Sequence, residues 1–349
     1  MIALGVSGGV DSSVCAALLS SEGRPVRGVF MNNWHAQAGE PCRADQDRQD
    51  ALRVCAALGI PFSVRDFADE YKQNVFAEFL EKYRQGATPN PDILCNREVK
   101  FKVFLNDCLE GGADQIATGH YARTAVVNGQ TCLLRGVDKT KDQSYFLHAV
   151  PASALARTVF PLGGLEKTEV RKIANDYNLV TARKKDSTGI CFIGEQDFKS
   201  FLGSYLPAQA GDIVDTDGRT LGRHHGALFY TVGQRAPLGG VKGASDLPWF
   251  VVEKDVAFNR LIVVQGRDHS LLNKTTFSVT DLSWVNSAPS RNFEGEVQIR
   301  HLGEAISCRV TVSDDNVSVE TSRPHFGVAR GQYAVFYQGD LCLGGGVIA

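Results

Sequence analysis

The stretch LGVSGGVDSS, residues 4–13, decides the fold of the first half of this 349-residue chain. The apolar run at 2–6 predicts a short buried strand, and the pattern at 11–23 predicts a helix that ends at Gly23. A strand that turns through Gly8 and Gly9 into a helix presents backbone N–H groups and hydroxyls to an anion. Because Gly, Ser and Asp also favour an ordinary capped turn, the stretch alone leaves both interpretations open.

Strand and helix signals alternate along the first 200 residues. We expect further buried strands at 26–31, 62–67 and 113–121, and helices at 47–61, 71–86 and 97–112. This alternation predicts a doubly wound parallel α/β sheet, whose ligands bind beyond the carboxyl ends of the strands. Both SGGVDSS (7–13) and TGHY (118–121) are expected at such ends.

The pattern changes near residue 200. A hairpin with Asp-Gly at its tip is expected at 211–222, and two strands around a turn are expected at 249–266. The stretches 293–303, 306–321 and 331–348 alternate in strand fashion, which predicts a small antiparallel barrel or sandwich. We therefore expect a catalytic domain at 1–200, a central β-rich domain at 201–270 and a C-terminal β-barrel at 271–349, with a linker at 266–275.

Composition excludes several classes of protein. The net charge of −2 is not that of a protein that binds nucleic acid over its whole surface, although 182–186 and scattered arginines leave a local basic face open. No apolar run reaches about 18 residues and no signal peptide is evident, so we expect a cytoplasmic protein without a membrane partner. Nine cysteines without a C-x-x-C pair disfavour zinc ribbons and iron–sulfur ligation.

The loop at 7–13 contains no lysine, so G-x-x-x-x-G-K-[ST] is absent and transfer of a γ-phosphate is disfavoured. SGGVDSS instead resembles the pyrophosphate-binding loop of the ATP pyrophosphatases, a group that includes NAD and GMP synthetases and tRNA sulfurtransferases. That resemblance implies cleavage of ATP between the α- and β-phosphates and adenylation of a substrate oxygen. Asp11 is then suited to help hold Mg²⁺ on the phosphates.

Two cysteines lie in settings that favour reactivity. Cys95 follows a proline-rigidified turn in TPNPDILCNREVKF (88–101) and precedes a helical pattern, which favours its thiolate. Asp92 lies three residues earlier, where it could orient a substrate or take a proton. Cys191 lies in DSTGICFIGEQDF (186–198), after a basic stretch. Each cysteine, taken alone, is also compatible with an inert buried thiol.

Seven segments occur in the order found in the bacterial tRNA-specific 2-thiouridylases, and the resemblance runs from residue 2 almost to residue 349. They are GVSGGVDSS, VFMNNW, TPNPDILCN, ATGHYAR, KDQSYFL, RKKDSTGICFIG and YTVGQR. The resemblance implies an ATP site at Gly5, Val6, Ser7, Gly8, Gly9, Val10, Asp11, Ser12, Met31 and Gly119. It implies tRNA contacts at Asn90, Pro91, His120, Lys141, Asp142, Gln143, Arg300, His301 and Gln332. The variable loop at 35–47 contains Cys42, which we leave unassigned.

The same resemblance implies a mechanism. ATP would adenylate the C2 oxygen of the wobble uridine in tRNA for lysine, glutamate and glutamine, releasing pyrophosphate. Cys191 would carry sulfur as a persulfide from a cysteine desulfurase or a relay protein, and AMP would leave when sulfur attacks C2. Cys95 would then form a disulfide with Cys191, and Asp92 would act as acid/base. The flipped uridine would lie among these three residues.

Two other functions stay open from the residues alone. An amidating synthetase related to NAD or GMP synthetase would use the same loop with ammonia and would not need two placed cysteines. A tRNA-binding scaffold with a decayed nucleotide site is disfavoured by the intact S-G-G-V-D-S core.

Overall fold

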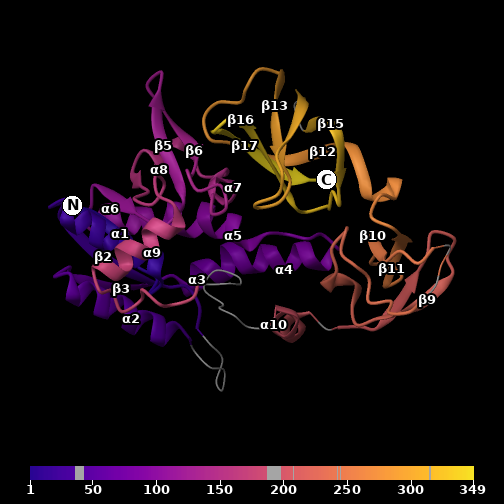
Figure 1. Cartoon of the computed structure of the whole chain (residues 1–349), viewed down its shortest axis with the longest axis horizontal. Coiled ribbons are helices and arrows are strands. Elements are labelled where there is room, and N and C mark those ends of the chain that lie inside the picture. The colour runs from indigo at the N-terminus through magenta and orange to yellow at the C-terminus, as the bar shows by residue number, and fades with distance from the viewer. Residues whose placement is uncertain (36–42, 187–197, 207, 242, 244, 314–315) are drawn as a thin grey trace.

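The computed structural model describes residues 1–35, 43–186, 198–206, 208–241, 243, 245–313 and 316–349. The N-terminal sheet (Figure 1) contains strands β1 (Ile2–Gly5), β2 (Val26–Asn32), β3 (Phe62–Asp66), β4 (Gln115–Ala117) and β7 (Thr158–Val159). Their order is β3-β2-β1-β4-β7 and all four pairings are parallel, which confirms the doubly wound sheet. Because the order reverses at β1 and β4, the crevice between their carboxyl ends is the expected ligand site.

Alternate residues of β1 face two separate cores, as the two-residue period of a strand requires. Ile2 and Leu4 pack with helices α1 (Val10–Ser21), α2 (Arg43–Ala57) and α9 (Lys167–Asp176). Ala3 packs in a second core with two long helical stretches. The first consists of α3 (Ala68–Tyr71), the π-helical segment η1 (Lys72–Phe76) and α4 (Ala77–Arg84). The second consists of α5 (Pro91–Leu94), the π-helical segment η2 (Cys95–Phe104) and α6 (Leu105–Glu110).

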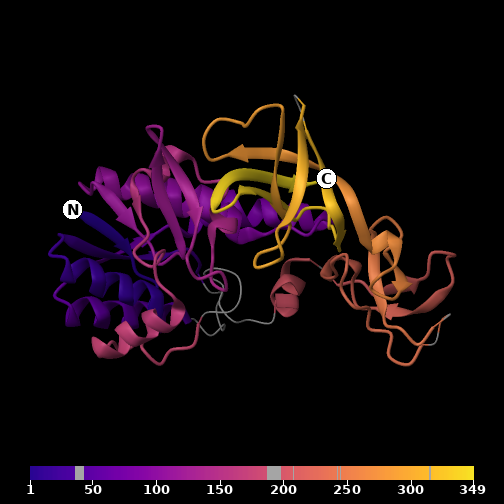
Figure 2. The same cartoon turned by 45° about the horizontal axis from the view of Figure 1, so that its top comes forward.

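A four-stranded central sheet follows the short helix α10 (Phe198–Tyr205). Its strands are β8 (Gly211–Val214), β9 (Thr220–His224), β10 (Trp249–Asp255) and β11 (Arg260–Gln265), in the order β10-β11-β8-β9, with the turn η3 (Ala227–Phe229) beside it. The hairpin at 211–222 and the strand pair at 249–266 are therefore confirmed. Figures 1 and 2 show the N-terminal and central sheets at opposite ends of the molecule, with the C-terminal strands between them.

The C-terminal strands form a closed antiparallel barrel. They are β12 (Asn273–Trp284), β13 (Asn292–Gln298), β14 (Ile306–Val312), β15 (Val317–Phe326), β16 (Tyr333–Gln338) and β17 (Leu341–Ile348). The barrel closes because β12 pairs with both β15 and β17. The expected linker at 266–275 is partly wrong, since η4 (Ser270–Leu272) buries Leu272 and β12 already begins at Asn273.

The sequence analysis missed a hairpin that crosses from the N-terminal region into the barrel sheet. Strands β5 (Ala122–Val127) and β6 (Gln130–Arg135) form this hairpin, and Leu133 and Leu134 of β6 pair with β17. The short helices α7 (Ser144–Leu147) and α8 (Ala152–Leu155) follow it. The N-terminal region and the barrel thus share one eight-stranded sheet.

Candidate active site

The glycine loop lies between the carboxyl end of β1 and the first turn of α1. Gly8 has φ +72°, and Gly9 caps α1 with extended backbone. The Ser12 hydroxyl accepts a hydrogen bond from the Ser7 backbone N–H (3.1 Å), and the Ser13 hydroxyl donates to the Gly9 carbonyl (2.7 Å). A Cβ at Gly8 would lie 2.2 Å from the Asp47 carbonyl oxygen of α2, so only glycine fits there. These contacts fix the loop's backbone where an anion would bind.

Two residues from other strands converge on this loop. A Cβ on Gly5 would lie 3.3 Å from Cε of Met31 in β2, and a Cβ on Gly119, after β4, would lie 3.1 Å from the Ser12 backbone nitrogen. The expectation that SGGVDSS and TGHY lie together at the carboxyl edge of the sheet is confirmed. The structure therefore brings together the ten residues proposed for ATP: Gly5, Val6, Ser7, Gly8, Gly9, Val10, Asp11, Ser12, Met31 and Gly119.

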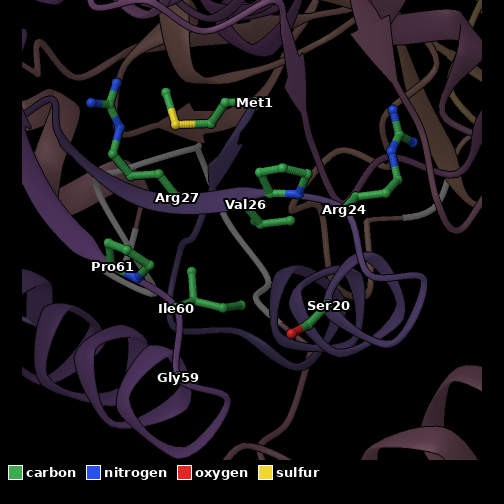
Figure 3. A pocket seen from close by; sticks show the side chains of 9 residues that line it. Met1, Ser20, Arg24, Val26, Arg27, Gly59, Ile60 and Pro61 are labelled. Atoms are coloured by element: carbon green, nitrogen blue, oxygen red, sulfur yellow. The ribbon is translucent and has the colours of Figure 1, made fainter.

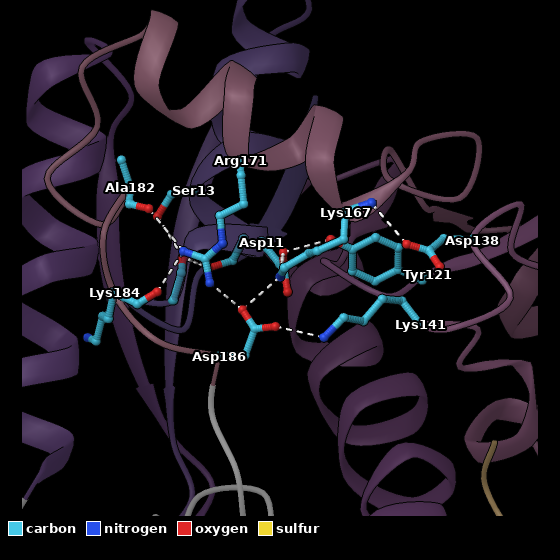
Figure 4. A network of polar contacts seen from close by, with 12 residues as sticks. Asp11, Ser13, Tyr121, Asp138, Lys141, Lys167, Arg171, Ala182, Lys184 and Asp186 are labelled. Atoms are coloured by element: carbon cyan, nitrogen blue, oxygen red, sulfur yellow. Dashed lines mark hydrogen bonds and ion pairs between the residues drawn. The ribbon is translucent and has the colours of Figure 1, made fainter.

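A network of ion pairs covers the start of α1 (Figure 4). The Lys167 Nζ lies 2.6 Å from Asp11 Oδ1 and 2.9 Å from Asp186 Oδ1, and the Tyr121 hydroxyl donates to Asp11 Oδ1 at 2.9 Å. Asp186 also pairs with Arg171 and, at 2.8 Å, with Lys141. Although burial raises the pKa of Asp186, hydrogen bonds from Lys141 and Lys167 hold it at about 2. Asp186 is thus ionised at any physiological pH.

A second lysine fastens the glycine loop to α2. The Lys184 Nζ donates to the Gly8 carbonyl (2.9 Å), to Asp47 (2.7 Å) and to Asp50 (2.8 Å). Burial lowers the pKa of Lys184, but the hydrogen bonds that it donates to these two carboxylates raise the pKa overall. The basic stretch at 182–186, which left a surface role open, therefore contributes Lys184 to the glycine loop.

The sequence analysis missed most of this cationic network. It found no lysine in the loop, whereas the structure supplies Lys167 and Lys184 from 156 and 176 positions away along the chain. No local motif could have connected these positions, because Lys167 reaches Asp11 through the packing of α9 against α1, and Lys184 lies beyond the end of α9.

Cys95 lies one turn into the helical stretch that Pro91 begins. The Asn90 side chain caps this stretch by accepting a hydrogen bond from the Asp92 N–H (3.0 Å), which is the turn chemistry of N-P-D. Cys95 is fully buried and is the first residue of the π-helical segment η2, while Asp92 is half-buried. Cys191 and Cys42 lie outside the described residues.

His301 of the barrel meets the N-terminal region beside this helix. Its ring centroid lies 4.3 Å from that of Phe146, and its Nε2 contacts the Asp142 carbonyl at 3.0 Å. Burial lowers the pKa of His301, and the Asp92 carboxylate and Lys141 are among the charges that act on it. His301 thus connects the barrel to the segment that contains Asp142 and Phe146.

Other residues proposed for tRNA turn their side chains to the protein interior. The buried Asp142 carboxylate accepts hydrogen bonds from the Gly136 N–H (2.9 Å) and the Ser144 N–H (3.1 Å), and pairs with Arg135. The His120 Nδ1 contacts the Thr118 hydroxyl at 2.8 Å, and burial holds its pKa well below the usual value. Both side chains thus have partners within the protein, which residue type alone does not reveal.

Three other residues proposed for tRNA are half-buried, and their side chains form hydrogen bonds with backbone groups of other segments; they are Gln143, Arg300 and Gln332. The Gln143 side chain accepts from the Tyr121 N–H at 3.1 Å. Arg300 donates to the Val232 carbonyl (3.1 Å) beside the central sheet and to the Gly327 carbonyl (2.8 Å) of the barrel. Gln332 donates to the Thr88 carbonyl at 2.8 Å.

Thr88 joins three parts of the molecule just before the helix that holds Cys95. Its N–H donates to the Arg330 carbonyl of the barrel (2.9 Å). From β10, the Lys254 Nζ donates to the Thr88 hydroxyl (3.1 Å) and the Ala87 carbonyl (3.2 Å). Burial lowers the pKa of Lys254 to about 8. The position of the Asn90–Asp92 turn therefore depends on the central sheet and the barrel.

A cavity of about 550 Å³ lies elsewhere, lined by Met1, Ser20, Arg24, Pro25, Val26, Arg27, Gly59, Ile60 and Pro61 (Figure 3). These residues lie around the amino ends of β1, β2 and β3 and the end of α1, at the opposite edge of the sheet from the glycine loop. The cavity is therefore separate from the candidate site. Within the described part of the chain, no group of three or more His, Cys, Asp or Glu could hold a metal ion, and no helix is long and apolar enough to cross a membrane.

Comparison with known proteins covers nearly the whole chain. Residues 1–195, 199–265 and 274–348 match family models described as a tRNA methyl transferase HUP domain, a tRNA methyl transferase PRC-barrel domain and an aminomethyltransferase beta-barrel domain. The chain is 53% identical over 352 residues to the tRNA-specific 2-thiouridylase MnmA of Xanthomonas euvesicatoria pv. vesicatoria (strain 85-10), covering all of this chain and 93% of that protein.

A second relative and one solved structure complete the comparison. Identity to the tRNA-specific 2-thiouridylase MnmA of Stenotrophomonas maltophilia (strain R551-3) is 52% over 353 residues, with the same coverage of 100% and 93%. The U34-tRNA thiolase NcsA from Methanococcus maripaludis, solved with its [4Fe-4S] cluster, aligns with a TM-score of 0.36 and 19% identity. That alignment covers 59% of this chain and 66% of NcsA, and it is too remote to inform function.

Proposed function

The chain belongs to the tRNA-specific 2-thiouridylase family, and from this premise we propose that it is a tRNA sulfurtransferase that uses ATP to replace an oxygen of uridine with sulfur. We further propose that the target is C2 of the wobble uridine in tRNA for lysine, glutamate and glutamine. The observation that carries the proposal is a glycine loop, fixed at the start of α1, with Asp11 held by Lys167 at the carboxyl edge of the sheet. Because ATP and tRNA are cytoplasmic molecules, we propose the cytoplasm as the site of action.

The glycine loop is suited to hold the pyrophosphate that leaves when the uridine oxygen is adenylated. Its Gly8 backbone is fixed by Lys184 and α2, so N–H groups at the start of α1 would bind phosphate oxygens without rearrangement. Oxygens of Asp11 and Asp186 converge on the Lys167 ammonium, and such hard oxygen donors also suit Mg²⁺. When bound, Mg²⁺ would neutralise charge on the phosphates.

We propose that sulfur transfer takes place beside the helix that begins at Pro91. The terminal sulfur of a Cys191 persulfide attacks C2, and AMP leaves with the former uridine oxygen. The Cys95 thiolate attacks the remaining Cys191 sulfur as the S–S bond of the persulfide breaks, which leaves a Cys95–Cys191 disulfide that a cellular thiol reductant reopens. Asp92 is the proposed acid/base, and a cysteine desulfurase or relay protein supplies the persulfide. The complete burial of Cys95 supports a site closed to water.

We propose three domains at 1–200, 201–270 and 271–349 for this enzyme. The proposal is supported by the separate central sheet and the closed barrel. The β5–β6 hairpin belongs to the first domain by its sequence position, but it pairs with the sheet of the barrel.

The decisive experiment is nucleoside mass spectrometry of unmodified tRNA incubated with the enzyme, ATP, Mg²⁺ and a persulfide source. We expect 2-thiouridine together with AMP and pyrophosphate. Cys95→Ala and Cys191→Ala should abolish 2-thiouridine, whereas Cys308→Ala, a buried cysteine of the barrel, should retain it. If both of the first two variants keep full sulfur transfer, the proposed chemistry is refuted.

The same assay separates the alternative functions. An amidating synthetase would release AMP with ammonia and an acid substrate but would not modify tRNA. Because two family models are described as tRNA methyl transferase domains, a reaction with S-adenosylmethionine in place of ATP and persulfide tests methyl transfer, and we expect no product. A scaffold protein would form neither AMP nor pyrophosphate in the presence of tRNA.

A further inference from the structure

The glycine loop lacks a lysine of its own, yet one lysine is bonded directly to its acidic residue. Lys167 contacts Asp11, and its side chain is 13% exposed, so its ammonium is held close to the loop rather than in solvent. It lies 5.6 Å from the centre of the Tyr121 ring, which also bonds Asp11. A cation held this near the start of α1 has to contribute to the binding of any anion there.

Helix α9 directs the Lys167 side chain toward the loop, but its own N-terminus is already bonded. Glu166 and Glu169 form a reciprocal capping box, and the Lys167 N–H donates to Asp138 at 2.9 Å. These acceptors use N–H groups that would otherwise bind a phosphate. The contribution of α9 to an anion at the loop is therefore the ammonium of Lys167.

Of the cations that contact the glycine loop or its Asp11, Lys167 has fewer fixed partners than Lys184. Lys184 holds three acceptors that define the loop and α2. Arg171 is bonded to the carbonyls of Ala182 and Lys184 as well as to Asp186. If Lys167 moves, Asp186 keeps Arg171 and Lys141, and Asp11 keeps the Tyr121 hydroxyl.

We infer that Lys167 is the phosphate-binding lysine of this site, exchanging Asp11 for the β- and γ-phosphate oxygens when ATP binds. The inference rests on the proposed function, since it assigns the residue that grips the pyrophosphate. Triphosphate carries several negative charges where Asp11 carries one, so the exchange favours the nucleotide. It also leaves the Asp11 carboxylate available to Mg²⁺. In the ligand-free enzyme Lys167 keeps Asp11 and Asp186 from repelling each other.

The test is calorimetric binding of three probes to Lys167→Gln, in full-length protein without tRNA. The probes are α,β-methylene-ATP with Mg²⁺, pyrophosphate with Mg²⁺, and AMP. Loss of a charge-assisted contact predicts about 10- to 100-fold weaker binding of the first two probes. Binding of AMP, which lacks the pyrophosphate, should stay within about threefold of wild type.

Two further variants keep the result interpretable. Lys167→Arg retains the charge and should recover most of the affinity for pyrophosphate. Lys172→Gln removes an exposed lysine from the same helix and should bind all three probes as wild type does. If Lys167→Gln binds α,β-methylene-ATP as tightly as wild type, or weakens AMP to the same extent, the inference is overturned and Lys167 is structural. Wild-type protein that binds pyrophosphate but forms no 2-thiouridine refutes the proposed sulfur transfer and leaves the assignment of Lys167 standing.

Discussion

Gly8 offers the sharpest test of how the glycine loop is built, because two independent effects exclude a side chain there. Its φ of +72° is in the left-handed region, which costs a non-glycine residue about 1–2 kcal/mol. A Cβ would also lie 2.2 Å from the Asp47 carbonyl oxygen, whereas Cβ atoms essentially never come within 3.0 Å of a heavy atom, so the loop or α2 has to move. Overpacking of this kind costs about 1–3 kcal/mol. Gly8→Ala should therefore lower the free energy of unfolding by about 2–5 kcal/mol.

Two other glycines separate the two effects. Gly23 has a similar φ of +69°, but a Cβ there would meet nothing within 4 Å, so Gly23→Ala should cost about 1–2 kcal/mol. Gly9 has φ −91°, and its Cβ would come no closer than 3.5 Å to another atom, so Gly9→Ala should change stability by less than about 1 kcal/mol.

Urea-induced unfolding followed by circular dichroism measures all three variants under the same conditions, with an unchanged m-value as the check that the transition is comparable. The expected order of destabilisation is Gly8→Ala, then Gly23→Ala, then Gly9→Ala. A Gly8→Ala protein no less stable than Gly23→Ala would show that Asp47 does not confine the loop, and would refute the close packing of α2 against it.

Three further predictions concern buried and half-buried charges. Asp142→Asn should lower the free energy of unfolding by about 1–3 kcal/mol, because the carboxylate accepts hydrogen bonds from backbone N–H groups and pairs with Arg135. Unchanged stability together with weaker tRNA binding would show instead that Asp142 contacts RNA. Lys254 has a pKa of about 8 when folded and a higher value when unfolded, so the unfolded chain binds more protons between these values and stability rises with pH above about 8. In urea unfolding, the free energy of unfolding of the wild type should rise relative to that of Lys254→Met by up to about 1.4 kcal/mol per pH unit between pH 8 and 9.5. Parallel pH profiles of the two proteins would contradict this. Lys184→Met should lower the free energy of unfolding by about 1–3 kcal/mol, because it leaves Asp50 without its main partner. Lys185→Met, at an exposed position, should not measurably change thermal unfolding. Equal effects of the two variants would argue against Lys184 fastening the glycine loop to α2.

The order of the parallel strands explains how much of the site could be predicted. Buried parallel strands are continuous apolar runs, so 2–6 and 26–31 were found within one or two residues of β1 and β2, and the edge strand β3 was found at 62–67 although it is only partly buried. Because each loop follows its strand directly, the meeting of Ser12 with Gly119 followed from the topology.

Long-range pairing could not be predicted in the same way. The hairpin β5–β6 carries a turn signal at Asn128 and Gly129, both with positive φ, and could have been found, but its pairing with β17 could not. Lys167 reaches Asp11 through the packing of α9, which leaves no local pattern in the sequence. Nor does the residue type of Asp142 show that its carboxylate faces inward.

The sharing of one sheet between the N-terminal region and the barrel has a consequence for the growing polypeptide. Leu133 and Leu134 pair with β17, and the Tyr145 hydroxyl bonds the Tyr333 carbonyl, 188 positions further along the chain. At about 5–20 residues per second, a ribosome needs roughly 10 to 40 s to make that distance. During this interval the apolar side of the hairpin and part of the core around Cys95 lack their cover, because Tyr333 and Tyr337 have not yet been made. The glycine loop and the core around Cys95 are therefore completed at different times during translation, because only the second of them needs the last strands of the barrel.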